Sequence, residues 1–534
     1  MIGLTATFAA PHIEYGDISP ILILFGVATL GILLEVVVPR RYRFVTQAWV
    51  AAVGILAALG ATAGVWTIID PGADQPKLGK VVAEGAFALD GPTLLGWTLI
   101  LVLALMGALL FAERRLDGGV SAFAGQAATV PGSASEREAA RLEHGEIFPL
   151  LMFSVAGMLV FVAANDLIVT FIALEIVSLP LYLLCALARR RRLLSQEAAM
   201  KYFLLGAFSS GFFVYGMALT YGYAGSFGYA EIATAVQGRV GAHALLLGGM
   251  GLLAVGLLFK VGAVPFHTWI PDVYQGAPTA LSGFMAAATK VAAFGALLRL
   301  FYVAFGAARW DWEPAMWVVA IATMVVGSVL ALSQRDVKRL LAYSSIAHAG
   351  FVLVGLLGAR TLDASGQIQP VQAVLFYLTS YGFMTMAAFA IVMLVRDTTG
   401  EATSFASWRG LGKESPIVAG LFAFLLLAMA GVPLTSGFTG KWAVFTAVLA
   451  AGSWQLLVIA IFSSAVALAF YIRVIVVMFF QESEIEDTSA RAAVALPSAM
   501  TSAVIGLGVS ATVVLGVVPG PFLDLLGRIS TFIR

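Results

Sequence analysis

The chain has little charge and almost no cysteine. Asp, Glu, Lys and Arg make up 11% of its 534 residues, whereas soluble domains carry about 25%. The single cysteine, Cys185, excludes a disulfide framework and any iron–sulfur cluster ligated by cysteines of this chain alone. The five histidines lie far apart in the sequence and form no metal-ligand pattern. A net charge of +1 gives no sign of a surface that binds nucleic acid.

Hydrophobic residues dominate the chain instead. They make up 60% of it, and the mean hydropathy is +0.95, so most side chains cannot face water. A membrane-spanning helix needs about 20 mainly apolar residues. On that criterion we predict an all-α polytopic membrane protein with about 14 transmembrane helices. In chain order, these predicted spans 1 to 14 are 19–38, 47–69, 93–112, 147–164, 166–188, 202–224, 244–268, 279–301, 315–332, 340–358, 371–395, 416–448, 455–479 and 496–521.

The loops between the spans predict an orientation. Those after odd-numbered spans carry most of the Lys and Arg residues, including Arg40, the run 189–192 and Lys338. The positive-inside rule places these loops in the cytoplasm and both termini on the outer, periplasmic side. Span 1 is expected to be a retained helix, because few positive charges precede it and no small-residue cleavage site follows it.

The spans group into parts, and two of these parts resemble each other. Val264-Pro265 in span 7 and Val432-Pro433 in span 12 occupy corresponding places in two units of five spans. Five is odd, so the second unit must be inverted, as in transporters that carry a broken helix in each half. The predicted parts are 1–112 with three spans, the polar cytoplasmic loop 113–146, the first unit 147–302, the inverted second unit 315–480, and 481–534 with a cytoplasmic loop and the final span.

Four ionisable residues are predicted to lie deep inside spans. They are Glu175 in span 5, Lys260 in span 7, Lys290 in span 8 and Lys441 in span 12. A charge at the bilayer centre is costly, so such residues normally face the bundle interior and serve a function. A lysine in low dielectric gives up its proton more readily, and an approaching carboxylate opposes that, so a Glu–Lys pair can load and release a proton. The alternative is a static ion pair that only fixes helix packing.

The other cations of the spans have plainer interpretations. Lys201 follows Glu197 by four residues, which favours a local helical pair. Arg299 and Arg473 lie near helix ends and are expected to extend their charged groups toward the membrane surface.

Prolines and polar side chains next to these lysines complete the candidate site. Pro265 and Pro433 each remove a backbone donor, and a break beside a buried lysine is where water can reach it. His267 follows Lys260 by seven residues, and His348 follows Ser344 by four, so each pair would share a helix face. With Tyr343, these residues form a candidate proton relay, although a lone histidine is often only a packing residue.

The sequence around these residues resembles a known family, the antiporter-like membrane subunits of respiratory complex I (NADH-quinone oxidoreductase). Residues 259–279 (FKVGAVPFHTWIPDVYQGAPT) resemble its broken-helix signature, and residues 336–350 (DVKRLLAYSSIAHAG) its span-10 signature. Residues 199–211 (AMKYFLLGAFSSG) and the LEIVSLP context of Glu175 are similar to the subunit N branch in particular. The resemblance extends over spans 4 to 13.

This resemblance implies a proton-translocating subunit in the membrane arm of a bacterial plasma-membrane complex. It implies that Glu175 and Lys260 form a coupled pair, that Lys290 leads toward the centre and outlet, and that Lys441 is the span-12 lysine. His267 and His348 would belong to the polar line through the bundle. The chain would be one subunit of a translocase, without a cofactor of its own. Flavin, iron–sulfur clusters, NADH and quinone would belong to partner subunits. The expected partners are the lipid bilayer, the antiporter-like subunits L and M, and the small membrane subunits A, J and K, with no nucleic acid.

Two other functions remain open from the sequence. A subunit of a multi-subunit cation/proton antiporter would share the fold and the Glu–Lys pair. A non-transporting membrane scaffold would use the buried charges only to hold helices together.

Overall fold

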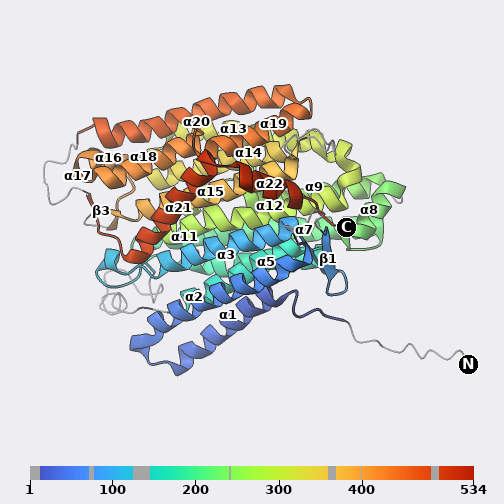
Figure 1. Cartoon of the computed structure of the whole chain (residues 1–534), viewed down its shortest axis with the longest axis horizontal. Helices are drawn as coiled ribbons and strands as arrows, with labels where there is room; N and C mark the ends of the chain where they lie inside the picture. Colours follow the sequence, from blue (N-terminus) through green and yellow to red (C-terminus); the bar gives the residue numbers. More distant parts are fainter. Residues whose placement is uncertain are drawn as a thin grey trace, which may run out of the picture.

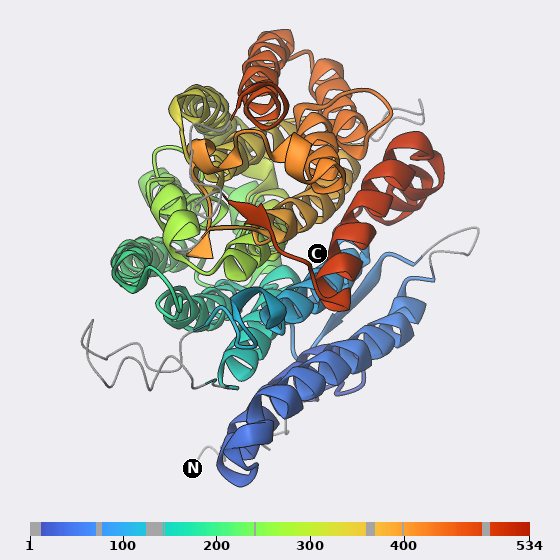
Figure 2. The same ribbon diagram turned by 90° about the vertical axis from the view of Figure 1, so that its left-hand side faces the viewer.

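The computed structural model describes residues 12–70, 77–123, 143, 145–239, 242–358, 369–397, 400–482 and 492–533. Most of the predicted loop 113–146, and the acidic positions 484–487, lie outside these residues. The long helices lie side by side along the longest axis of the molecule (Figure 1). Seen from the end of the bundle, α1 and α2 form an outer pair at one edge, and α20 lies at the opposite edge (Figure 2).

The first part of the chain forms three long helices and one hairpin. Arg40 follows directly after the Pro39 cap of α2, so this helix begins seven residues before the predicted span. Strands β1 and β2 pair antiparallel just before α3, and the Asp90 carboxylate caps that helix by accepting from the Thr93 N–H. The elements are α1 (Ser19–Val37), α2 (Arg40–Val65), η1 (Trp66–Ile68), β1 (Gly79–Val82), β2 (Phe87–Asp90), α3 (Gly91–Phe111) and η2 (Arg115–Asp117).

The next part contains predicted spans 4 to 8, which form the first five-span unit. In predicted span 7, α9 ends at Val261, seven residues before the predicted end at 268, and the short α10 begins just after the span; span 8 is one helix that contains two π-helical stretches. Lys290 begins the α-helical part directly after the first stretch. The elements are α5 (Ile147–Ala163), α6 (Leu167–Cys185), α7 (Arg192–Ala224), α8 (Tyr229–Gly238), α9 (His243–Val261), α10 (Trp269–Gly276), α11 (Thr279–Phe284), η3 (Met285–Thr289), α12 (Lys290–Arg299), η4 (Leu300–Ala304) and η5 (Gly306–Ala308).

The remaining part contains the second five spans and the last helix. The predicted span 416–448 divides into α18 and α19, and α21 packs beside α15 and α19. The elements are α13 (Arg309–Ser333), α14 (Val337–Leu356), α15 (Pro370–Val392), β3 (Val395–Asp397), β4 (Gly400–Glu401), α16 (Phe405–Trp408), α17 (Leu411–Glu414), α18 (Pro416–Ala430), α19 (Ser436–Ala450), α20 (Trp454–Phe480), β5 (Ala493–Val494), α21 (Ala499–Val517) and α22 (Gly520–Ile529).

The helical membrane fold predicted from the hydropathy is confirmed. Within the described residues, 12 helices are long and apolar enough to cross a membrane, or 13 if the bent pair Phe405–Glu414 and Pro416–Ala430 is one span. Each predicted span coincides with a helix, but α5 has only 17 residues and α18 and α19 have 15 each. The exact number of 14, the inverted orientation of the second unit and the side of the termini therefore stay predictions.

Both predicted helix breaks are present and have the same local cause. α9 ends at Gly262 with φ +77°, and α18 ends at Gly431 with φ +92°. In each case, the glycine N–H and the next N–H donate to one carbonyl near the helix end, Leu258 O or Leu427 O. A left-handed residue at this position ends a helix and satisfies its last carbonyls, and glycine adopts it without steric cost. The proline that follows prevents the helix from resuming at once.

The centre of the bundle is closed to the surroundings. In the most apolar 18 residues of Thr279–Ala304 and of Pro370–Val392, 94% of the residues are buried. The corresponding share in α1, α7 and α21 is only 28%. The exposed helices present apolar side chains that suit lipid or a neighbouring subunit. Polar side chains on the enclosed helices therefore face only other parts of this chain, and Lys290 is one of them.

Candidate functional site

The predicted Glu175–Lys260 pair lies between α6, α7 and α9 without direct contact. The Lys260 ammonium is buried and donates to the Ser178 hydroxyl at 2.7 Å and to the Tyr202 hydroxyl at 3.2 Å. The Glu175 carboxylate, one turn before Ser178 on α6, accepts from the Ser210 hydroxyl. Within the described residues no ion pair joins Glu175 to Lys260. The lysine is therefore held by neutral hydroxyls, and one of them belongs to Ser178, one helical turn after Glu175 on α6.

Lys290 binds a backbone carbonyl at the helix break in span 7. Its buried ammonium donates to Val261 O at 3.1 Å and to Ser345 O on α14 at 2.8 Å. In an unbroken helix, the Val261 carbonyl would accept from residue 265, but Pro265 has no N–H. The freed carbonyl is thus used by Lys290. From the sequence, this break is expected to serve Lys260. In the structure, the carbonyl of Val261, the residue after Lys260, also connects the break to Lys290.

Lys441 binds a backbone carbonyl at the second helix break, in span 12, in a comparable way. Its buried ammonium donates to Ala430 O, the last carbonyl of α18, at 2.7 Å, and to the Ser464 hydroxyl on α20 at 2.9 Å. It also lies 5.0 Å from the centre of the Phe351 ring, a favourable cation–π distance. Both Lys290 and Lys441 therefore bind the end of a broken helix, one in each predicted unit.

A hydroxyl and imidazole cluster lies between these lysines. The two ring nitrogens of His348 lie 2.7 Å from the Tyr377 hydroxyl and 3.1 Å from the Tyr471 hydroxyl. The Ser344 hydroxyl also bonds to Tyr471. His348 and Ser344 thus share one partner on α20. Because each of these groups can both donate and accept, the cluster can pass a proton along.

Two of the predicted relay residues lie outside this cluster. α9 has ended before His267, so the regular face that was expected to join it to Lys260 does not exist. The His267 ring Nδ1 is buried without a hydrogen-bond partner in the described structure. Tyr343 packs its ring against the apolar core, and no side-chain hydrogen bond is found for it within the described residues.

The predictions for the other cations need two corrections. Arg299 does not extend to the membrane surface: it is completely buried, and its Nη2 donates to the two Asp90 oxygens at 2.6 and 2.8 Å. Lys338 is not a loop cation, because α14 begins at Val337 and so includes it. The Lys338 side chain is buried. Lys201 does pair with Glu197, at 2.7 Å, as predicted.

Sequence reasoning missed the hydroxyl partners of Lys260, Lys441 and His348. Ser178 has a signal in the sequence, since it stands one turn after Glu175 in an apolar helix. The others come from three further helices, and nothing in their local sequence separates them from packing residues: Tyr202 lies on α7, Tyr377 on α15, and Ser464 and Tyr471 on α20. No group of three or more His, Cys, Asp or Glu side chains suited to a metal ion is found in the described part of the chain.

The polar groups form an interrupted line through the bundle. It leads from Glu175 and Lys260 through Lys290 to His348 and Lys441, across α6, α9, α12, α14 and α19. These groups can hold and exchange protons, and the apolar packing around them excludes bulk water. Such a line in a broken-helix bundle defines an antiporter-like membrane subunit.

Comparisons with known proteins agree with that class. Residues 164–467 match the family of NADH:quinone oxidoreductase/Mrp antiporter transmembrane proteins. A Nocardioides protein described as NADH-quinone oxidoreductase subunit N is 58% identical over 531 residues, covering 99% of this chain and 100% of the relative. The chain therefore belongs to the NADH-quinone oxidoreductase subunit N branch of this family.

Solved structures share the fold. A chain of respiratory complex I from Thermus thermophilus with bound aureothin is 32% identical, with a TM-score of 0.73, and covers 96% of this chain and 100% of that chain. A chain of the Mrp complex from a Dietzia strain has a TM-score of 0.75 but is only 20% identical, over 96% of this chain and 97% of that chain. The second likeness supports the fold alone.

Proposed function

We propose that this chain is a proton-translocating subunit in the membrane arm of a bacterial NADH-quinone oxidoreductase. NADH oxidation and quinone reduction would take place in partner subunits, which would hold the flavin, iron–sulfur clusters and quinone. Other membrane-arm subunits, including the antiporter-like L and M and the small A, J and K, would be its neighbours. The predicted orientation would place both termini in the periplasm.

The observation that carries this proposal is the placement of Lys260 and Lys290 around one helix break. Lys260 is the second-last residue of α9, and Lys290 binds the carbonyl of the last. Two ammonium groups inside the same low-dielectric bundle repel each other. A proton that arrives on Lys260 therefore favours departure of a proton from Lys290 toward the His348 cluster, and Glu175 sets how readily Lys260 holds its proton.

Lys260→Met tests the proposal in the assembled complex. Methionine fills a similar volume without the charge, so the expected result is at least about a tenfold fall in inhibitor-sensitive NADH:quinone turnover, as for loss of a proton-transfer group. NADH oxidation by an artificial acceptor should stay unchanged. The matched control is Lys413→Met, because Lys413 pairs with Glu482 at 3.0 Å on the exposed surface.

The rival functions predict other results. An assembled Lys260→Met complex with normal turnover and proton-to-electron ratio would identify the chain as a scaffold. Affinity purification of the tagged wild-type chain separates the antiporter: small hydrophobic partners without flavin, iron–sulfur signals or redox activity would contradict the proposal.

A further inference from the structure

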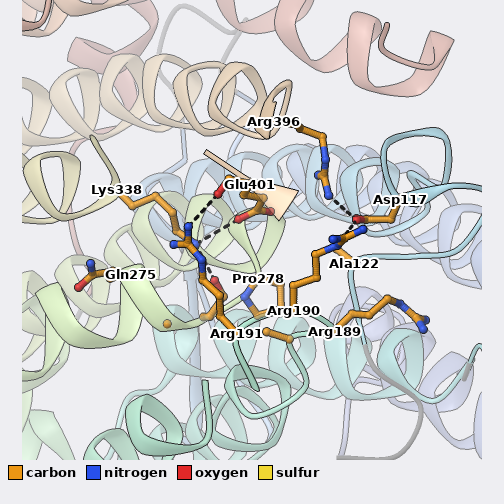
Figure 3. Close-up of a pocket in the computed structure, with 13 residues that line it drawn as sticks. Asp117, Ala122, Arg189, Arg190, Arg191, Gln275, Pro278, Lys338, Arg396 and Glu401 are labelled. Atoms are coloured by element: carbon orange, nitrogen blue, oxygen red, sulfur yellow. Dashed lines mark hydrogen bonds and ion pairs between the residues drawn. The ribbon is translucent and has the colours of Figure 1, made fainter. Parts of the chain in front are cut away.

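A small cavity of about 40 Å³ is lined by residues outside the candidate site described above, and Figure 3 shows them. It is lined by the segment after α3, the α6–α7 loop, the α10–α11 junction, the start of α14 and the β3–β4 hairpin. The loops among these are on the side that the sequence predicts to be cytoplasmic. The volume suffices for at least one water molecule, and the polar lining would retain it.

Charged side chains from all three parts of the chain meet around the cavity. Arg190 on the α6–α7 loop lies 3.3 Å from Asp117, which also binds Arg396 of the hairpin. Arg191 donates to the Glu401 backbone carbonyl at 3.0 Å. Figure 3 shows the two acidic residues at separate places, each approached by cations. Arginine does not release its proton in proteins, so proton exchange here depends on the other groups.

Lys338 and Glu401 are the exchangeable pair that reaches inward. The Lys338 side chain is 2% exposed and the Glu401 side chain 20%, and their charged groups lie 3.6 Å apart. Glu401 also accepts from the Thr279 hydroxyl. The Lys338 ammonium donates to Ala277 O at 2.7 Å, just past the end of α10. Asp117 binds Arg190 and Arg396 instead, and among the described residues no lysine that reaches inward is paired with it.

Polar groups continue from this pair to Lys290. Ser345 follows Lys338 by seven residues on α14, about 10 Å deeper and on the same helix face. Tyr274, one turn before Ala277, is buried on α10, and α10 packs against α14. The Ser345 hydroxyl on α14 is buried and has no hydrogen-bond partner among the described residues, and the Ser345 backbone carbonyl accepts from Lys290 at 2.8 Å.

We propose that Lys338 and Glu401 form the inlet through which protons from the cavity reach Lys290. This inference rests on the proposed function and adds a place of uptake to it. A proton from the cytoplasm, relayed through water in the cavity, adds to the Glu401 carboxylate, and the new O–H bond then breaks as an N–H bond forms on neutral Lys338. Lys338 passes that proton inward past Tyr274 and Ser345, and the Glu401 carboxylate is regenerated. One proton enters per cycle, without a redox step.

The test compares Lys338→Met, Lys338→Arg and Glu401→Gln in the assembled complex. Arginine preserves the positive charge next to Glu401 but cannot hand its proton on. The expected result is at least about a fivefold loss of coupled turnover in all three variants, with the artificial-acceptor rate intact. The matched controls are Lys413→Met and Glu482→Gln, which remove the same charges from the exposed pair.

Each alternative outcome has its own meaning. Full turnover with Lys338→Arg, together with a loss in Lys338→Met, would overturn the inlet and show an ion pair that only joins the units. Full turnover in all Lys338 and Glu401 variants would also overturn it, while a loss in Lys260→Met would leave the proposed function standing. If the Lys338 variants fail to assemble, the inlet is tested with Glu401→Cys.

The cysteine variant is informative because Cys185, the one native cysteine of this chain, is buried. A thiol reagent that labels this chain would therefore report the introduced cysteine. A membrane-impermeant thiol reagent should label Glu401→Cys in inverted vesicles and not in right-side-out vesicles, as followed by the mass of this chain. An anionic reagent should react faster than a cationic one, because five cations line the cavity against two acids in the wild-type chain. Absence of labelling from the cytoplasmic side would overturn the inlet.

Discussion

The completely buried Asp90–Arg299 pair supports a stability prediction that can be refuted by a double-mutant cycle. It joins α3 to α12, two helices whose bonded residues are 209 positions apart. Asp90 also accepts from the Ile533 N–H at 3.1 Å, and Phe532 lies 4.9 Å from the Arg299 guanidinium, so the pair fixes the end of the chain as well. Both side chains have 0% of their surface exposed to solvent.

The expected magnitude follows from that burial. Arg299→Met leaves the Asp90 carboxylate buried without its counter-charge, and loss of one partner of a buried pair costs about 3–5 kcal/mol. The lower figure corresponds to roughly a hundredfold change in the ratio of folded to unfolded chain. Asp90→Asn should cost a similar amount, because the Arg299 charge remains. Asn also caps helices, so the start of α3 would be retained. The double variant removes both charges and should cost less than either single change.

The assay is the survival of the solubilised complex. Preparations of the four forms are heated through a temperature series, and the fraction of this chain that stays in the assembled complex is measured on native gels. Arg299→Met and Asp90→Asn should lose assembly at lower temperatures than the wild type, with the double variant between them and the wild type. A single variant as stable as the wild type, or a double variant no better than the singles, would refute the reasoning.

Two further predictions concern other carboxylates, the half-buried Glu175 and the buried Glu113. Glu175→Gln should depress pumping-coupled quinone reduction and leave electron transfer to an artificial acceptor intact, because it removes the charge near Lys260 but preserves an oxygen for Ser210; equal loss of both activities would indicate misassembly instead. Glu113→Ala should lower the thermal stability of the complex by about 1–3 kcal/mol, because it leaves the Ser498 N–H and the Thr501 hydroxyl at the start of α21 without their acceptor. Glu113→Gln, which preserves an oxygen, should lose less in the same heating assay.

The sequence predicts the breaks because their causes are local. The glycine that ends α9 and the proline that follows it are within four residues of each other, and so are those that end α18. The deep positions of Lys260, Lys290 and Lys441 follow from the length of the apolar runs around them. These features depend on neighbours in the chain, which a single sequence displays.

The partners of these lysines could not be predicted, because they come from distant parts of the chain. Lys290 meets Ser345, and His348 meets Tyr471, 55 and 123 positions away. Arg299 looked like a residue at the membrane surface because Asp90 precedes an apparently separate span. Lys338 looked like a loop residue because polar neighbours surround it in sequence, although the fold covers it. Long-range packing decides each of these cases.

The binding of Lys290 and Lys441 to helix ends has a mechanical consequence. The carboxyl end of a helix carries a partial negative charge of roughly half an elementary unit. Each ammonium is therefore balanced by a backbone dipole, and no carboxylate is paired with either lysine in the described part of the chain. A dipole of this kind moves with its helix as a rigid body. Any tilt that draws the end of α9 or α18 away from its lysine removes the counter-charge, so displacement of a helix is converted directly into a change of electrical potential at the ammonium.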